Sequence, residues 1–93
     1  MIQISFFLYN VLADAVGARQ IHKTVPEGTP LLEAIQKLAS EYPGAFQTLL
    51  LPNGDLSNYL KVFVNGRLVG QPDSRKILRD GDAIMLFPAV SGG

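Results

Sequence analysis

The residues with the clearest chemical potential stand at the end of the chain, where Ser91, Gly92 and Gly93 follow an apolar strand that stops at Pro88. Proline cannot donate a ladder hydrogen bond, so it closes that strand. Glycine has no Cβ, and two glycines hold the terminal carboxylate on a thin tether that fits a narrow channel in another protein. We therefore predict a flexible tail from about residue 89, in which Val90, Ser91 and Gly92 position the carboxyl carbon of Gly93 for reaction.

Side chains that commonly catalyse reactions or bind metals are few. The single histidine, His22, falls in an expected edge strand and has no partner at metal-ligand spacing, and the chain has no cysteine. Ser91 beside two glycines lacks the strand–turn–helix setting of a nucleophile elbow. The run from Asp80 to Asp82 lacks the remaining oxygen ligands of a calcium loop. We therefore expect no metal site, no bound cofactor and no enzyme activity of the chain by itself.

Length and charge indicate a single domain, residues 1–93, whose partners are proteins. Eight basic and eight acidic side chains cancel, so no long-range field attracts nucleic acid or anionic lipid. The apolar run from Ile2 to Leu12 has no basic segment before it and is too short to span a bilayer. The absence of cysteine suits a reducing compartment. We expect no nucleic-acid or membrane partner and a cytoplasmic location.

Hydrophobic periodicity predicts five strands and one long helix. Alternating apolar residues indicate strands over residues 2–9, 19–25, 61–64, 67–69 and 84–87, and Asn65-Gly66 is a strong hairpin signal. Thr29 is expected to cap the helix with its hydroxyl, with Pro30 at the first helical position. The apolar stripe of the helix runs from Leu31 to Tyr42.

The segment between the helix and the third strand has two interpretations. Its apolar residues Phe46, Leu49, Leu50 and Leu51 indicate a short helical turn tucked under the sheet. The same segment could instead be a loop that binds a partner.

The first and last strands are the most apolar, so we place them in the centre of the sheet as parallel neighbours, with the helix on one face. This is a compact α+β roll. Side-chain parity then directs a set of apolar residues to the other face, near the root of the tail, where they form a candidate partner-binding patch: Phe7, Phe63, Leu68, Met85 and Phe87. Alternatively, a small second layer, such as residues 46–51, covers this face.

The pattern resembles the ubiquitin-like β-grasp sulfur carriers, most specifically the small subunit of molybdopterin synthase (the MoaD/ThiS family). The opening Met1 to Phe7, the helix from Thr29 to Pro43 and the hairpin Val64-Asn65-Gly66 resemble that family. The most specific part is the ending, from Asp80-Gly81-Asp82 to Ser91-Gly92-Gly93. The resemblance covers nearly the whole chain and implies a mixed-sheet β-grasp roll with one main helix on one face.

The resemblance also implies a mechanism. A ubiquitin-activating-type adenylyltransferase uses ATP to join Gly93 to AMP, and a sulfur donor then displaces AMP to leave a C-terminal thiocarboxylate. The molybdopterin synthase large subunit, expected to form a heterotetramer with this chain, receives the tail and its sulfur for molybdenum cofactor biosynthesis.

Other roles remain open at this point. The ending and the lengthened segment 44–59 are also similar to carriers that serve cysteine biosynthesis or tRNA thiolation. The same tail would serve a ubiquitin-like modifier that joins Gly93 to lysine side chains. In a third interpretation, the domain only binds partners and its terminal glycines are incidental.

Overall fold

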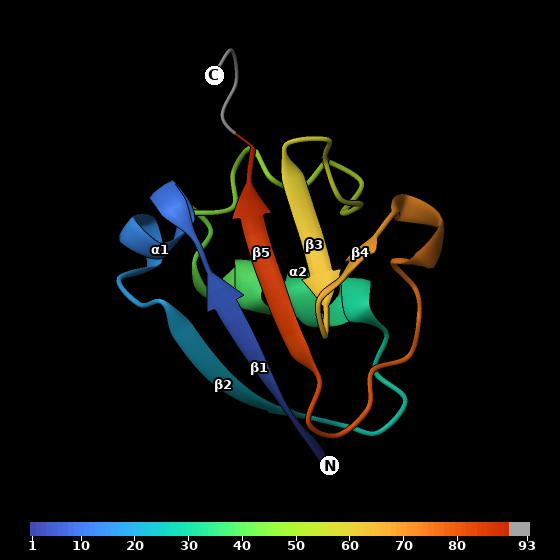
Figure 1. The fold of residues 1–93 in the computed structure, drawn as a ribbon. Helices are drawn as coiled ribbons and strands as arrows, with labels where there is room; N and C mark the ends of the chain where they lie inside the picture. The colour runs from blue at the N-terminus through green and yellow to red at the C-terminus, as the bar shows by residue number, and fades with distance from the viewer. Residues whose placement is uncertain (90–93) are drawn as a thin grey trace.

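The computed structural model describes residues 1–89, which form a mixed five-stranded sheet with one long helix packed on one face (Figure 1). The elements, in chain order, are β1 (Ile2–Leu8), α1 (Asn10–Val16), β2 (Gln20–Val25), α2 (Leu31–Glu41), β3 (Leu60–Val64), β4 (Arg67–Val69), the 3₁₀ helix η1 (Gln71–Asp73) and β5 (Ala83–Pro88). The order of strands across the sheet is β2-β1-β5-β3-β4. Val90, Ser91, Gly92 and Gly93 lie outside the described residues.

The two most apolar strands, β1 and β5, lie side by side in the centre of the sheet and run parallel. Their inward side chains are almost completely buried: Phe6 is 1% exposed and both Ile84 and Leu86 are 0% exposed. Parallel strands need cover because their pattern leaves little polar surface, and α2 supplies that cover. The predicted α+β fold and its central parallel pair are therefore confirmed.

The start of α2 differs from the prediction. The helix begins at Leu31, with Pro30 as its N-cap residue and no side-chain cap. The Thr29 hydroxyl instead donates to the carbonyl oxygen of residue 26 at 2.6 Å, where it closes the preceding turn. Backbone carbonyls satisfy the first helical amides: Leu31 and Leu32 donate to the oxygens of residues 76 and 74, at 2.9 and 2.7 Å. A neighbouring chain segment thus replaces the expected hydroxyl cap.

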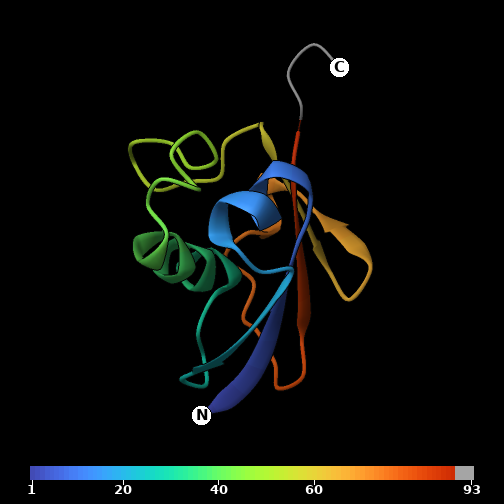
Figure 2. The same ribbon diagram turned by 90° about the vertical axis from the view of Figure 1, so that its left-hand side faces the viewer.

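The segment that follows α2 packs on the helix side of the sheet (Figure 2). Phe46 and Leu49 are 3% and 5% exposed and belong to the core, as expected. Residues 43–49 form successive hydrogen-bonded turns rather than a regular helix. Leu51, which was expected to be tucked under the sheet with them, is 42% exposed. The segment is tied to the helix by the Gln36 side-chain amide, which donates to the Gly54 carbonyl at 2.8 Å. It therefore does not cover the face of the sheet opposite α2.

The connection between β1 and β2 is a two-turn helix, α1. It packs against the core through Leu12, which is 1% exposed. Gly17 ends it with a left-handed backbone, φ 85°, that glycine adopts without strain. No helix in residues 1–89 is long and apolar enough to cross a membrane.

The position of Leu86 gives a test of the core. We expect Leu86→Ala to lower the free energy of unfolding by about 2–5 kcal/mol, because it leaves a cavity under α2. Leu51→Ala makes the same chemical change at an exposed turn and should stay within about 0.5 kcal/mol of the wild type. Urea unfolding followed by circular dichroism measures both. Equal losses in the two variants would show that the core is placed wrongly.

Candidate interaction face and the root of the tail

The point at which the chain leaves the sheet is well defined. Ala89, the last described residue, donates its backbone N–H to the carbonyl oxygen of Tyr59 at 2.6 Å. Just before it, Pro88 pairs with Leu60 at the end of the β3–β5 ladder. The four predicted tail residues continue from this fixed point but lie outside the described part. We call residues 88–89 the tail root.

The predicted apolar patch forms a continuous row across the sheet. The strand register places Phe7 beside Met85, Met85 beside Phe63, and Phe63 beside Leu68. Phe7, Phe63 and Met85 are half-buried, and Leu68 is 62% exposed. The row lies on the face of the sheet opposite α2, which we call the open face. The prediction that these side chains gather on one face is confirmed; their role in binding stays a prediction.

An aromatic cluster extends the open face to the tail root. The rings of Tyr9 and Phe87 stack, with centroids 4.0 Å apart and planes 8° from parallel. Phe63 meets Phe87 edge-on, with centroids 5.5 Å apart. Tyr9 was not among the predicted patch residues, although it has the same parity as Phe7 and lies one residue beyond β1. Rigid aromatic side chains lose little entropy on binding, so this cluster suits the centre of an interface.

The polar residues of the open face lie toward the edge strand β2. The Ser5 hydroxyl and Nδ1 of His22 are 3.0 Å apart, and the Gln20 side-chain amide lies 3.3 Å from Nε2 of the same ring. His22 is exposed, as expected of a surface residue. Among residues 1–89, no group of three His, Asp or Glu side chains is placed to hold a metal ion.

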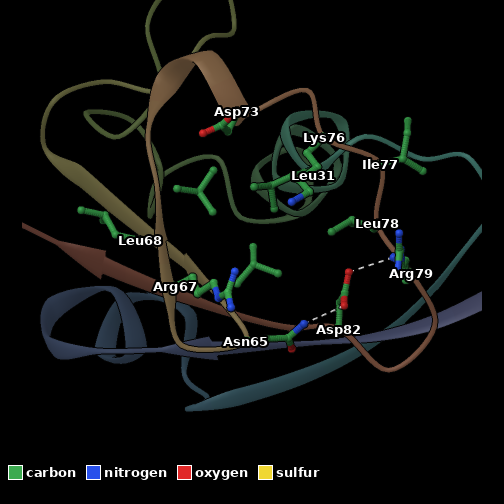
Figure 3. A pocket seen from close by; sticks show the side chains of 12 residues that line it. Leu31, Asn65, Arg67, Leu68, Asp73, Lys76, Ile77, Leu78, Arg79 and Asp82 are labelled. Carbon is green, nitrogen blue, oxygen red and sulfur yellow. Dashed lines mark hydrogen bonds between the residues drawn. The ribbon is translucent and has the colours of Figure 1, made fainter.

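A cleft of about 490 Å³ lies at the other end of the molecule, beside the β3–β4 hairpin (Figure 3). Asp82 organises it by accepting hydrogen bonds from the Asn65 side chain at 2.9 Å and the Arg79 backbone at 2.8 Å. These bonds fix the turn that leads into β5. Because Asp82 and Ala89 flank opposite ends of that strand, about 20 Å separates this turn from the tail root. The cleft shares Leu68 with the open face, but its hydrogen bonds serve the hairpin and lie away from the tail root.

These features define a class of protein. The sheet is mixed, with a parallel central pair, and one long helix lies on a single face. The tail continues from the central strand. This combination is the ubiquitin-like β-grasp arrangement. The model of the ThiS family matches residues 8–93, so this chain belongs to the ThiS family. The predicted resemblance is confirmed at the level of the family.

Known proteins with similar chains are modifiers and carriers. Small archaeal modifier protein 3 of Haloferax volcanii is 30% identical over 93 residues, which cover 99% of this chain and 98% of that protein. The crystal structure of SAMP1 from the same organism has a TM-score of 0.82 and 26% identity, and covers 98% of this chain and 99% of that chain. A putative molybdopterin converting factor, subunit 1, from Pyrococcus furiosus has a TM-score of 0.78 and 20% identity, covering 97% of this chain and 100% of that chain. The chain is thus similar to ubiquitin-like small modifiers and carriers.

The ring stack gives a prediction that can be measured without a partner. In a double-mutant cycle of Tyr9→Ala and Phe87→Ala, we expect a coupling energy of about 0.5–1.5 kcal/mol, because the two rings stabilise each other beyond the area they bury. Tyr9 and Leu68 lie three strands apart, so their cycle should give a coupling energy near zero. Urea unfolding of each variant supplies the values. A Tyr9–Phe87 coupling as small as the control would contradict the stack.

Proposed function

We propose that this protein is a sulfur carrier whose C-terminal Gly93 is adenylated and then converted to a thiocarboxylate. Its membership of the ThiS family supports this proposal, as does the sequence of the ending, Ser91-Gly92-Gly93. The observation that carries it is the geometry of the tail root. The central strand β5 ends next to the aromatic cluster of the open face, and the bond between Ala89 and Tyr59 fixes the residue from which the tail continues.

The chemistry of activation takes place on the terminal carboxyl group. A carboxylate is a poor electrophile, so the activating adenylyltransferase lets it attack the α-phosphorus of ATP, and pyrophosphate leaves. A donor that supplies sulfur at the level of hydrosulfide then attacks the acyl carbon of Gly93, AMP leaves, and the terminal thiocarboxylate remains. Gly92, Ser91 and Val90 place the reacting group, while the open face holds the enzyme. The carrier itself is not an enzyme in this proposal, and the use of ATP places the reaction in the cytoplasm.

Within this class, we propose the small subunit of molybdopterin synthase as the specific role, with the large subunit as the sulfur-accepting partner in a heterotetramer. The fold of the Pyrococcus furiosus putative molybdopterin converting factor subunit agrees with this role. Carriers for cysteine biosynthesis or tRNA thiolation use the same activation and differ in the protein that accepts the sulfur.

A second candidate function is protein modification. The 30% identity to small archaeal modifier protein 3 of Haloferax volcanii over nearly both whole chains favours it. In that case, a lysine side chain attacks the Gly93 adenylate and forms an isopeptide bond. Both functions share the activation step and diverge only in the group that displaces AMP.

The intact mass of the protein from its own cells separates the two functions. A carrier should gain about 16 mass units, because one oxygen of the terminal carboxylate is replaced by sulfur. A modifier should appear in larger covalent adducts with other proteins. Neither species would be found if the terminal glycines are incidental.

Extension of the chain by one residue beyond Gly93 tests the chemical site. The extension moves the reactive carbon by about 3.5 Å but keeps a terminal carboxylate and the open face. Because a misplacement of about 1 Å can cost about a hundredfold in rate, we expect no measurable release of pyrophosphate with ATP and the activating enzyme. Binding to that enzyme should remain. Adenylation at the wild-type rate would rule out Gly93 as the reacting residue.

Replacement of Phe87 tests the open face. We expect Phe87→Asp to weaken binding of the activating enzyme by about 2 kcal/mol or more, because a buried interface anchor would become a desolvated charge. The fold should persist, since the ring points away from α2. Titration calorimetry measures the affinity, and Leu51→Asp provides a control with the same charge at an exposed turn. Equal affinities of the two variants would place the interface elsewhere.

A further inference from the structure

A second apolar surface borders the tail root on the side opposite the open face. It is a groove of about 460 Å³ between α1 and the segment that follows α2. Figure 2 shows both elements on the helix side of the sheet, near the end of β5. One wall includes Val11 and Ala15, the other includes Ala45 and Leu49, and Ala89 of the tail root also lines it. We call this surface the root groove.

The chemistry of the root groove is apolar. None of its lining residues carries a charge, and their polar side-chain groups are hydroxyls. Two of its large apolar side chains remain in solvent: Val11 is 64% exposed and Tyr59 is 51% exposed. An uncharged groove with exposed apolar side chains is typical of a surface that another protein covers.

The alternation of β5 connects the groove to the tail. Phe87 points to the open face, whereas Pro88 is buried on the helix side and lines the groove. Ala89 lines the same groove, and the Cα atom of the next residue, Val90, is about 3.8 Å along the chain. A protein that holds the tail therefore meets the open face on one side of the strand and the root groove on the other.

We propose that the root groove receives an apolar side chain, of the size of leucine or phenylalanine, from the activating adenylyltransferase. This inference rests on the proposed function. The groove begins at Ala89, the last residue before the tail, and four residues span at most about 14 Å, so an enzyme that encloses Gly93 comes close to the groove. Activation is the step that sulfur carriage and protein modification share, and for this reason the activating enzyme is its occupant. The groove also gives the segment 44–59 a role, since residues from this segment form one wall.

The experiment compares Val11→Glu with Ile77→Glu. Both residues are β-branched aliphatic side chains, exposed by 64% and 52%, and both changes add the same charge. Ile77 lies beside the hairpin cleft, at the far end of the molecule. Glutamate in the first turn of α1 is compatible with the helix. Ala15→Glu is a second groove variant, also at an exposed position of α1, should Val11→Glu fail to fold.

The measurement is ATP–pyrophosphate exchange with the activating enzyme of the source organism, at increasing concentrations of each variant. We expect Val11→Glu to raise the KM for the carrier about tenfold or more and to change kcat less than twofold, because the tail still reaches the catalytic centre once bound. Val11→Leu should keep the wild-type KM, and Ile77→Glu should change it less than twofold.

Different outcomes separate this proposal from the proposed function. If the wild-type protein is adenylated and Val11→Glu and Ile77→Glu have equal KM values, the proposal that the enzyme binds the root groove is overturned. The proposed function then still stands. A wild-type protein that is not adenylated at all would overturn both. A wild-type dimer that Val11→Glu converts to a monomer, with no change in KM, would assign the groove to a second copy of the chain and also overturn the proposal.

Discussion

Parallel pairing of β1 with β5 places the first and last strands of the described chain side by side in the middle of the sheet. Both strands must bury one face, and α2 covers that face with a nearly continuous apolar stripe. With β5 in the centre, its outward residues have neighbours on both sides, so Met85 and Phe87 become parts of a wide apolar surface. An edge position would leave the same residues isolated. The apolar open face and the position of the tail root therefore both follow from this one pairing.

Local patterns predicted the strands because side-chain parity in a half-buried sheet repeats every two residues. This was sufficient to place Phe7, Phe63, Met85 and Phe87 on one face. Tyr9 lies within the expected strand 2–9 but was left out of the patch, because its stack on Phe87 depends on where the ends of β1 and β5 meet, which local parity does not show. Thr29 was assigned as a helix cap from its residue type, but the carbonyl groups of a distant segment satisfy the helix amides instead. This exchange of a hydroxyl cap for distant carbonyl groups depends on tertiary packing, which local sequence does not encode.

The root groove could not be predicted from the sequence for a similar reason. Its walls come from residues more than 25 positions apart, and it exists only because Leu12 and Leu49 both enter the core and carry their segments with them. Each segment alone shows unremarkable small and apolar residues, such as Ala15 and Ala45. Core packing by the segment 44–59 is compatible with the partner binding that we propose for it, because Phe46 and Leu49 are buried while Ala45 and Leu49 also line the groove.

The position of β5 also has a mechanical consequence. It is bonded to β1 on one side and to β3 on the other, and the tail continues from its last residue. A force applied to the tail along the strand axis loads both hydrogen-bond ladders in shear, so many bonds resist it together. A strand at the edge of a sheet, pulled sideways, would instead open one bond at a time. A pull on the end of β5 along the strand axis should therefore leave the domain folded.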